Sequence, residues 1–432
     1  MTDQGSHHAS RPLATLLRSL RHRNFRLFFT GQLVSLVGTW MQSVAQSWLV
    51  YRMTGSALLL GTIAFLGQFP VLLLAPVGGI VADRRGRHGV VVATQVASMI
   101  LAFALAALTL TGRVQVWEVG VLAALGGVVS AFDIPARQAF IVEMVGREDL
   151  PNAIALNSSM FNGARVLGPA VAGVMVAVIG EGWCFLVNGV SFLAVIAGLL
   201  MMRLPVHPHA LPSRSPARDV IEGFRYAWDT VPIRAILLLI GIISLWGMPY
   251  TVLMPIFADR VLNGGPRALG LLMGATGVGA LLGALTLAAR TSVRGLGRWA
   301  AWAAACFGGT LVLFSVSRSL VLSEAILVLV GFSMMVQLAS SNTLIQSMVP
   351  DRLRGRMMSL YSMMYMGMSP FGALLAGALA HRIGAPGAVA TGGALCVLAA
   401  ALFWSRIPAM RHEALRLIFA QGMAGGEPPE LG

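Results

Sequence analysis

The stretch GGIVADRRGRHG, residues 78–89, separates two long apolar segments and holds four charged side chains. Asp83 and three arginines crowd into it, although only 11% of the 432 residues are charged and 56% are hydrophobic. Soluble globular proteins have roughly 25% charged residues. The flanking apolar segments run for about 20 residues, the length that a helix needs to cross the hydrocarbon core of a bilayer. The stretch therefore indicates a polar turn between two spanning helices of an all-α integral membrane protein.

Apolar segments of this kind recur along the chain and predict twelve transmembrane helices. They are expected near residues 28–49, 58–82, 89–110, 116–136, 154–179, 183–202, 236–257, 268–289, 300–317, 321–343, 357–380 and 387–404. A polar stretch rich in Pro and Ser divides them six and six. We therefore expect an N-terminal bundle at 25–202, a cytoplasmic linker at 203–234 and a C-terminal bundle at 235–406. Cytoplasmic tails are expected at 1–24 and 407–432, the second of them disordered.

The two groups of six helices also resemble each other in sequence. EMVGREDLPNAIALNS (143–158) leads into the fifth span, and SMVPDRLRGRMMSLYS (347–362) leads into the eleventh. Each has a Met-Val pair, a charged turn and then a new apolar helix. Internal repeats are typical of secondary transporters, which bind substrate near the midplane between the two repeats. The expected fold is therefore a pair of pseudo-symmetric six-helix bundles.

The basic residues are all arginine, 31 in number, and their distribution predicts the orientation of the chain. If the N-terminus is cytoplasmic, the inner segments hold 24 arginines, the outer loops hold six, and Arg165 falls inside a span. Cytoplasmic loops carry such an excess, so both termini are expected in the cytoplasm. The net charge of +14 then reflects topology rather than nucleic-acid binding. Without lysine the chain has neither a Walker A motif nor a Schiff-base lysine.

Five residues of the opening stretch match the loop motif of the major facilitator superfamily, which the chain resembles. They are Gly79, Asp83, Arg84, Gly86 and Arg87, and they lie between the second and third spans, where the motif belongs. Three further stretches resemble the enterobactin-exporter-like (MFS_3) branch of that superfamily. They are NFRLFFTGQLVSLVGTWMQSVAQSWLVYRMTGS, AFDIPARQAFIVEMVGREDLPNAIALNS and VPDRLRGRMMSLY. The resemblance implies two bundles that work by alternating access.

The resemblance also implies a role for the charges of the opening stretch. In the family, contacts of this motif latch the cytoplasmic side while the transporter is open outward. Asp83 would then meet the start of the eleventh span, while Arg87 and Arg137 would hold Asp133 at the inner end of the fourth. The alternative is that the arginines only anchor the topology. We favour that alternative for Arg85, which matches no fixed position of the motif.

Polar side chains follow one face of the first span at steps of three and four residues. In lipid such a stripe is costly unless it faces water or other protein, so we expect it to line a substrate path. The alternative is that it hydrogen-bonds to neighbouring helices. Similar side chains recur in the seventh, tenth and eleventh spans. The candidates for the path are Gln32, Ser35, Thr39, Gln42, Gln46, Trp246, Tyr250, Gln337, Asn342 and Tyr365.

Arg165 lies near the middle of the fifth span, where a charge costs at least ~2.5–3.5 kcal/mol on insertion scales. It is therefore expected to bind an anionic part of a substrate or to form a structural pair. Around it, GARVLGPAVAG resembles a reduced form of the family's antiporter motif, which accompanies export. The matching residues are Gly163, Gly168, Pro169 and Gly173.

The expected function is export of a small amphipathic molecule, a siderophore or a drug-like compound, by proton-coupled antiport across the plasma membrane. The acids in or beside the spans, Glu118, Asp133 and Glu324, do not identify the proton carrier. The Arg that many drug antiporters have in the fourth span is replaced by Ala123. An importer, a uniporter and a non-transporting scaffold are the alternatives. Neither enzymatic activity nor a metal or cofactor is expected, and the family suggests a monomer.

Overall fold

A computed structural model describes residues 17–203, 216–290 and 295–421, and every regular element among these residues is helical. The N-terminal half consists of η1 (Arg18–Arg21), α2 (Arg23–Thr54), α3 (Ala57–Arg85), α4 (Arg87–Leu110), α5 (Val116–Ile179) and α6 (Glu181–Leu200). The C-terminal half consists of α7 (Pro216–Asp229), α8 (Val231–Ile242), η2 (Ile243–Gly247), α9 (Tyr250–Ile256), η3 (Phe257–Val261), α10 (Gly265–Ala288), α11 (Leu296–Val316), α12 (Leu320–Met348) and α13 (Asp351–Ala420). Elements η2 and η3 are π-helical turns within the seventh span.

Two of the helices are long because each contains two successive spans. A glycine with a positive φ interrupts each of them, Gly146 (φ 73°) in α5 and Gly384 (φ 79°) in α13. Only glycine adopts this conformation without steric cost, so the chain can reverse there and begin a new helix. α5 therefore supplies the fourth and fifth spans, and α13 supplies the eleventh and twelfth.

Nine helical segments of the described chain are long and apolar enough to cross a membrane. Because α5 and α13 count twice, these nine provide eleven spans. The remaining span is α2, whose 32 residues include the amide and hydroxyl stripe that lowers its hydropathy. The structure thus confirms the predicted twelve-helix, all-α membrane fold.

The prediction of a disordered tail from residue 407 is wrong for residues 407–420. Helix α13 continues to Ala420, and the side chains of Met410 and Ile418 are buried against the C-terminal half. Their spacing of eight residues places both on one face of the helix, which packing then stabilises. The expected linker also contains α7, and α8 begins at Val231, before the predicted span. Residues 1–16, 204–215 and 422–432 lie outside the described part of the chain.

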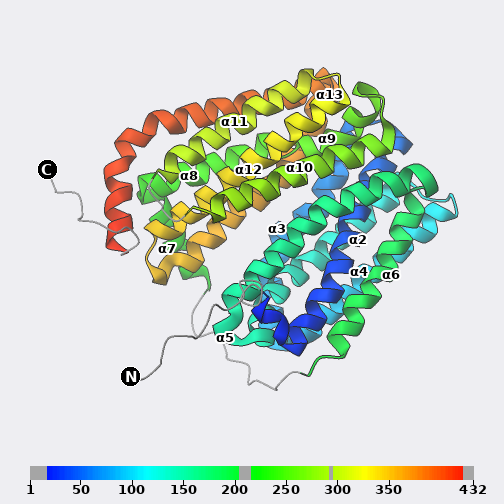
Figure 1. The fold of residues 1–432 in the computed structure, drawn as a ribbon, viewed down its shortest axis with the longest axis horizontal. Helices are drawn as coiled ribbons and strands as arrows, with labels where there is room; N and C mark the ends of the chain where they lie inside the picture. Colours follow the sequence, from blue (N-terminus) through cyan, green and yellow to red (C-terminus); the bar gives the residue numbers. More distant parts are fainter. Residues whose placement is uncertain (1–16, 204–215, 291–294, 422–432) are drawn as a thin grey trace, which may run out of the picture.

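The two halves lie side by side and meet at the end opposite η1 and the last turns of α13, which we call the joined end (Figure 1). Backbones pass closely there between α3 and α13 and between α5 and α10. A Cβ on Gly61 would lie 3.1 Å from Cα of Gly377, and one on Gly173 would lie 2.9 Å from Cα of Gly270. Small residues permit this approach, as in other packed membrane helices.

Polar contacts between the halves are also found at the joined end. The hydroxyl of Tyr51 donates to Asp259 Oδ2 at 2.6 Å, and Arg260 Nη2 donates to the carbonyl of Gly55 at 3.3 Å. At the other end, which we call the termini end, the ion pairs among described residues stay within one half. Midway, the rings of Phe69 and Phe371 are 6.0 Å apart. The described contacts therefore hold the halves together from the joined end to the middle.

Candidate functional site

The loop motif forms the sharp turn between α3 and α4 at the termini end. Gly86, with φ 87°, ends one helix and begins the other. One helical turn apart, Asp83 Oδ1 and Arg87 Nη2 are separated by 3.0 Å. Arg87 Nη1 also lies 3.1 Å from Glu143 Oε1 and donates to the carbonyl of Ala139 at 3.2 Å. The motif thus ties the α3–α4 turn to α5 within the N-terminal half.

Asp133 is buried inside the N-terminal half and has a different set of partners from the expected one. Thr94 and Gln95 of α4 each donate to its Oδ1 at 2.9 Å, and Arg137 Nε lies 3.2 Å from its Oδ2. The structure contains the expected contact of Asp133 with Arg137. The contact with Arg87, expected for the state that is open outward, is not formed here, because these three groups surround the carboxylate and Arg87 contacts Glu143.

Among the described residues, no hydrogen bond or ion pair joins Asp83 to the start of the eleventh span, where its partner is expected. Residue Met357 is buried, and a Cβ on Gly223 of α7 would lie 3.5 Å from its Cε. The start of the eleventh span is thus covered by the linker helix of its own half. Arg84 and Arg85 are both exposed at the turn. Of the motif glycines, Gly79 has only Pro135 within 4 Å of an added Cβ, whereas neighbouring Gly78 packs against the backbone of Ala131.

Two charged clusters at the termini end were not anticipated from the sequence. In the first, Asp149 lies 2.7 Å from Arg18 Nε, 2.9 Å from Arg21 Nη2 and 2.6 Å from His22 Nε2. These contacts, the one from His22 first, hold the pKa of Asp149 below its ordinary value of 3.8 despite the opposing effect of burial. The cluster fastens η1 to the turn between the fourth and fifth spans.

The second cluster occupies the corresponding turn of the C-terminal half with the charges exchanged. Glu222 of α7 accepts from Arg356 and lies 3.1 Å from Arg352 Nη1. The two arginines, Arg356 first, hold the pKa of Glu222 below its ordinary value of 4.5. Both clusters follow the repeated Met-Val pair, so the sequence repeat was the signal that could have located them.

The polar stripe of α2 divides between two environments. Gln32 and Ser35 are buried, and Gln42 accepts a hydrogen bond of 2.7 Å from Asn188 of α6. Nearby, a Cβ on Gly38 would lie 2.4 Å from the side-chain oxygen of Asn188. In this structure Gln42 therefore hydrogen-bonds to a neighbouring helix, which is the alternative to lining a substrate path. The remaining members of the stripe, Thr39 and Gln46, are exposed and half-buried respectively.

Arg165 lies between the two halves, near the middle of the molecule. Its Nη2 is 4.0 Å from the sulfur of Met334 in α12, and its guanidinium carbon is 5.9 Å from the ring centre of Trp40 in α2. It also lies within electrostatic range of the hydroxyls of Tyr250 and Tyr365. Among the described residues no carboxylate pairs with it. The structure therefore places a cation without an acidic partner among aromatic, thioether and hydroxyl groups.

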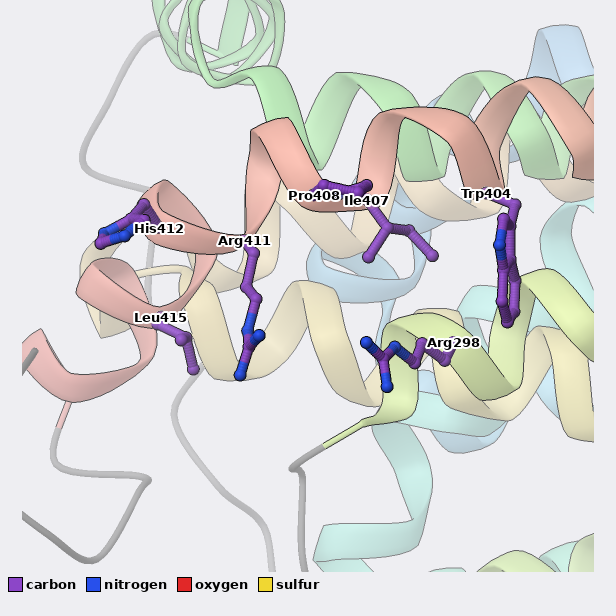
Figure 2. Close-up of a pocket in the computed structure, with 7 residues that line it drawn as sticks. All are labelled: Arg298, Trp404, Ile407, Pro408, Arg411, His412 and Leu415. Atoms are coloured by element: carbon purple, nitrogen blue, oxygen red, sulfur yellow. The ribbon is translucent and has the colours of Figure 1, made fainter.

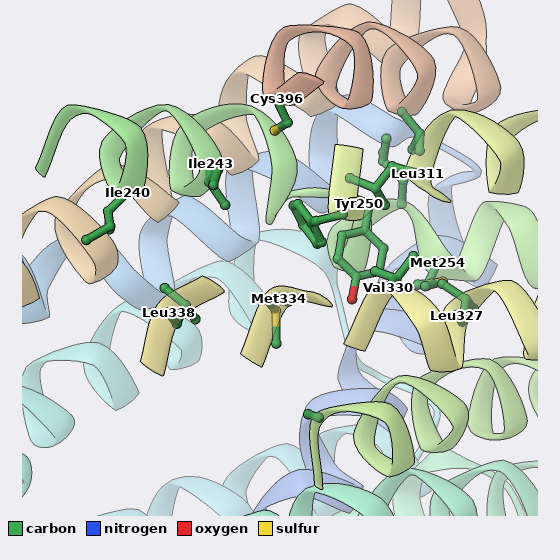
Figure 3. Packing of buried hydrophobic residues seen from close by; sticks show 14 of the residues in the cluster. Ile240, Ile243, Tyr250, Met254, Leu311, Leu327, Val330, Met334, Leu338 and Cys396 are labelled. Carbon is green, nitrogen blue, oxygen red and sulfur yellow. The ribbon is translucent and has the colours of Figure 1, made fainter. Parts of the chain in front are cut away.

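Several buried polar atoms of α2, α9 and α12 have no hydrogen-bond partner within the described chain. They are Gln32 Oε1, Tyr250 Oη, Gln337 Oε1 and Ser340 Oγ. Figure 3 shows the hydroxyl of Tyr250 directed away from Cys396, with its ring among apolar side chains that include Met334. An unpaired buried polar group costs about 1–3 kcal/mol, so these atoms are suited to accept a ligand or water.

The remaining candidates of the C-terminal half are held within it. Asn342 accepts a 2.5 Å hydrogen bond from Gln346 one turn along α12. The backbone carbonyl of Tyr365 accepts from Ser244, and the carbonyl of Trp246 would lie 2.2 Å from a Cβ on Gly392. These residues position the seventh span against α13. Among the predicted candidates, the structure thus gathers Arg165, Tyr250 and Tyr365.

The glycines of the antiporter-like motif have different surroundings. A Cβ on Gly168 would lie 2.4 Å from Cβ of Trp40, and Gly173 meets Gly270 across the two halves. The carbonyl of Pro169 lies 2.6 Å from the Cβ position of Gly270, whereas Gly163 has open space around it. The motif therefore packs α5 against both α2 and α10, and Gly163 takes no part in that packing.

Comparison with known proteins relates the chain to transporters of small molecules. The staphyloferrin A transporter of Staphylococcus aureus is 25% identical over 357 residues, covering 81% of this chain and 88% of that protein. The multidrug efflux pump Tap of Mycolicibacterium fortuitum is 28% identical over 370 residues, with coverage of 83% and 89%. The enterobactin exporter EntS of Shigella boydii is 26% identical over 363 residues, with coverage of 83% and 85%.

Solved structures share the fold at lower identity. A bacterial homologue of the iron transporter ferroportin in an inward-facing state superposes with a TM-score of 0.68 at 18% identity, over 89% of this chain and 98% of that one. A bacterial homologue of the lysosomal transporter Spinster superposes with a TM-score of 0.70 at 13% identity, over 94% and 99%. The sequence model of the MFS_3 family, described as transmembrane secretion effector, matches residues 14–422. The chain belongs to this family of major facilitator transporters.

Proposed function

We propose that this transporter exports small amphipathic anions, which it binds between the two halves at Arg165. The observation that carries the proposal is the charge of Arg165, which lacks an acidic partner among the described residues and lies beside Trp40 and Met334. A guanidinium prefers carboxylate and related anions, which it binds through paired hydrogen bonds. Aromatic and thioether groups around it accept varied apolar shapes. The named substrates of two relatives, both siderophores, support the export of such molecules.

The orientation that the arginine bias supports is compatible with export. With both termini in the cytoplasm, the termini end faces the cytoplasm and the joined end faces outward. The hydrogen bonds of Tyr51 and Arg260 then close the outer side. In this arrangement the site takes up its substrate from the cytoplasm. We further propose that the protein works as a monomer in the plasma membrane and that a proton gradient drives the cycle.

A transport assay in proteoliposomes tests this function. The purified protein is reconstituted with an internal pH dye, a proton gradient is imposed, and one substrate class is added at a time. The classes are carboxylate siderophores, catecholate siderophores, macrolides and lipophilic cations. Collapse of the gradient by an anionic class supports proton-coupled export. Transport without proton movement would indicate a uniporter or another ion, and a lack of transport for all classes would favour the scaffold alternative.

Substitution of Arg165 tests the site separately. We expect Arg165→Gln to weaken anion transport roughly tenfold or more, because a charge-assisted contact of that size is lost. Transport of a lipophilic cation should be unchanged or faster. Arg165→Lys, which keeps the charge, should restore part of the anion transport, and Arg382→Gln provides a control far from the site. An equal loss for anions and cations would show that Arg165 is structural.

A further inference from the structure

A pocket lies at the termini end of the C-terminal half, away from Arg165. It has a volume of about 550 Å³ and lies between the first turn of α11 and the last part of α13. Its lining residues are Arg298, Trp404, Ile407, Pro408, Arg411, His412 and Leu415. The loop motif, the charged clusters and the substrate candidates are all outside it.

The charge of this pocket is positive and uncompensated. Figure 2 shows Arg298 from α11 and Arg411 from α13 pointing into the same space, with His412 directed away from them. Both arginines are exposed, and within the described residues neither forms an ion pair. The nearest acid in sequence, Glu413, is half-buried, and no ion pair of it is found among the described residues. Two guanidinium groups without a carboxylate favour an anionic ligand, above all a phosphate, which they bind through paired hydrogen bonds.

The rest of the pocket is apolar, so the ligand that fits it has an apolar part as well. Trp404, Ile407 and Leu415 line the space beside the two arginines. The pocket also lies where the ninth span begins and the twelfth ends, at the level of the membrane surface. Tryptophan is enriched at that level because its ring is amphipathic. Beyond it, the last part of α13 (red) turns across the end of the C-terminal half (Figure 1).

We propose that this pocket binds one anionic phospholipid. The phosphate lies between Arg298 and Arg411, and an acyl chain extends along Trp404, Ile407 and Leu415. Phosphatidylglycerol carries one net negative charge, which offsets part of the positive charge of the pocket. Phosphatidylcholine has a choline cation beside its phosphate and is neutral overall, so it does not. The bound lipid connects the start of α11 to the end of α13 and fixes the terminal part of α13 at the membrane surface.

Native mass spectrometry of the full chain, released from micelles containing defined lipids, tests the proposal. We expect the protein to retain one phosphatidylglycerol and to retain phosphatidylcholine far less. In the double variant Arg298→Gln, Arg411→Gln, retention should fall roughly tenfold or more, because two charge-assisted contacts are lost. Arg416→Gln, which removes an exposed charge from the same terminal helix outside the pocket, should retain the lipid fully.

Two further measurements identify the source of the phosphate and the state of the protein. Millimolar inorganic phosphate should not displace the lipid, because the apolar contacts are absent from the free ion. Equal retention of the two lipids, or displacement by inorganic phosphate, would overturn the proposal. Thermal unfolding in phosphatidylcholine micelles should be the same for the wild type and the double variant. If it is the same and the double variant still retains the anionic lipid, the pocket is not its binding site.

Discussion

Tyr51 and Asp259 form the closest polar contact across the joined end. The phenol of α2 donates to the carboxylate of η3 at 2.6 Å, and Arg260 places its guanidinium carbon 5.8 Å from the centre of the Tyr51 ring. The sequence does not predict this contact, because the two residues are 208 positions apart and Asp259 is an isolated charge near the end of a span. The contact lies where the two halves must separate when the joined end opens. It therefore stabilises one state of the transport cycle.

Tyr51→Phe should shift the protein toward the state with an open joined end. The lost bond has a charged acceptor, and such bonds contribute about 1.5–3 kcal/mol, enough for a population change of roughly tenfold or more. Spin labels at the exposed positions 113 and 318, in a background without native cysteines, report the separation of the halves in a dipolar distance measurement. The longer distance should become more populated.

Tyr361→Phe is the matched control for this experiment. Its hydroxyl donates to the carbonyl of Leu338 at 3.0 Å, within the C-terminal half. This variant loses a phenolic hydrogen bond without touching the joined end. Similar distance distributions for the two variants would contradict the role assigned to Tyr51.

At the scale of elements, η1 is a short helix whose attachment depends on one carboxylate. The carboxylate of Asp149 forms ion pairs with Arg18, Arg21 and His22. The backbone N–H of Ser19 also donates to Asn152 Oδ1 at 2.9 Å. Four residues cannot hold a helical turn by themselves, so the cluster supplies the stability of η1. This element precedes α2 and is the part of the described chain closest to the N-terminus.

Acid should release η1 from α5. Because its partners lower the pKa of Asp149, the carboxylate is charged and the attachment complete above its ordinary pKa of 3.8. As the pH falls through the lowered value, protonation removes the attachment. Asp149→Asn should release η1 already at neutral pH. Hydrogen exchange of the backbone amides of η1 measures both effects, and unchanged protection in this variant would show that other contacts hold the element.

At the scale of the whole molecule, each half is fastened internally at the termini end. Arg87 connects the α3–α4 turn to Glu143, and Glu222 connects α7 to Arg352 and Arg356. The halves thus have internal ties at one end and mutual contacts at the other. This distribution suits two rigid bodies that rock against each other. We therefore expect the loop motif to contact the other half in the opposite state.

Asp83→Asn should therefore leave substrate binding in the present state nearly intact and slow the cycle. In this state the carboxylate of Asp83 contacts Arg87 of the same turn, and the pair is partly exposed. Such pairs contribute at most about 1 kcal/mol to stability. Transport rate and equilibrium binding of the same labelled substrate are the two measurements. Loss of binding with normal turnover would contradict the latch, and Arg85→Gln provides a control in the same turn.

The fold could be predicted because its signals are local and repeated. Apolar segments, charged turns such as the one around Asp83, and the repeated Met-Val pair specify the spans and their pairing into halves. The site was harder to predict because its partners come from distant elements. The Gln42 contact with Asn188 depends on how α2 packs against α6, and periodicity alone does not distinguish such a contact from a cavity lining. The helix at the end of α13 could have been predicted, because the apolar residues Met410 and Ile418 have a helical spacing in the sequence.

The polar face of α2 has a consequence for how the chain enters the membrane during synthesis. Gln42 finds its amide partner in Asn188, which the ribosome adds 146 residues later. Until α6 arrives, the nascent first helix exposes unpaired amides to the lipid or stays beside the insertion machinery. A polar group without a partner in an apolar medium is costly, so the first helix is expected to stay beside the insertion machinery until then. The first helix then inserts fully only after the sixth helix has been synthesised, because α6 supplies the partner of Gln42.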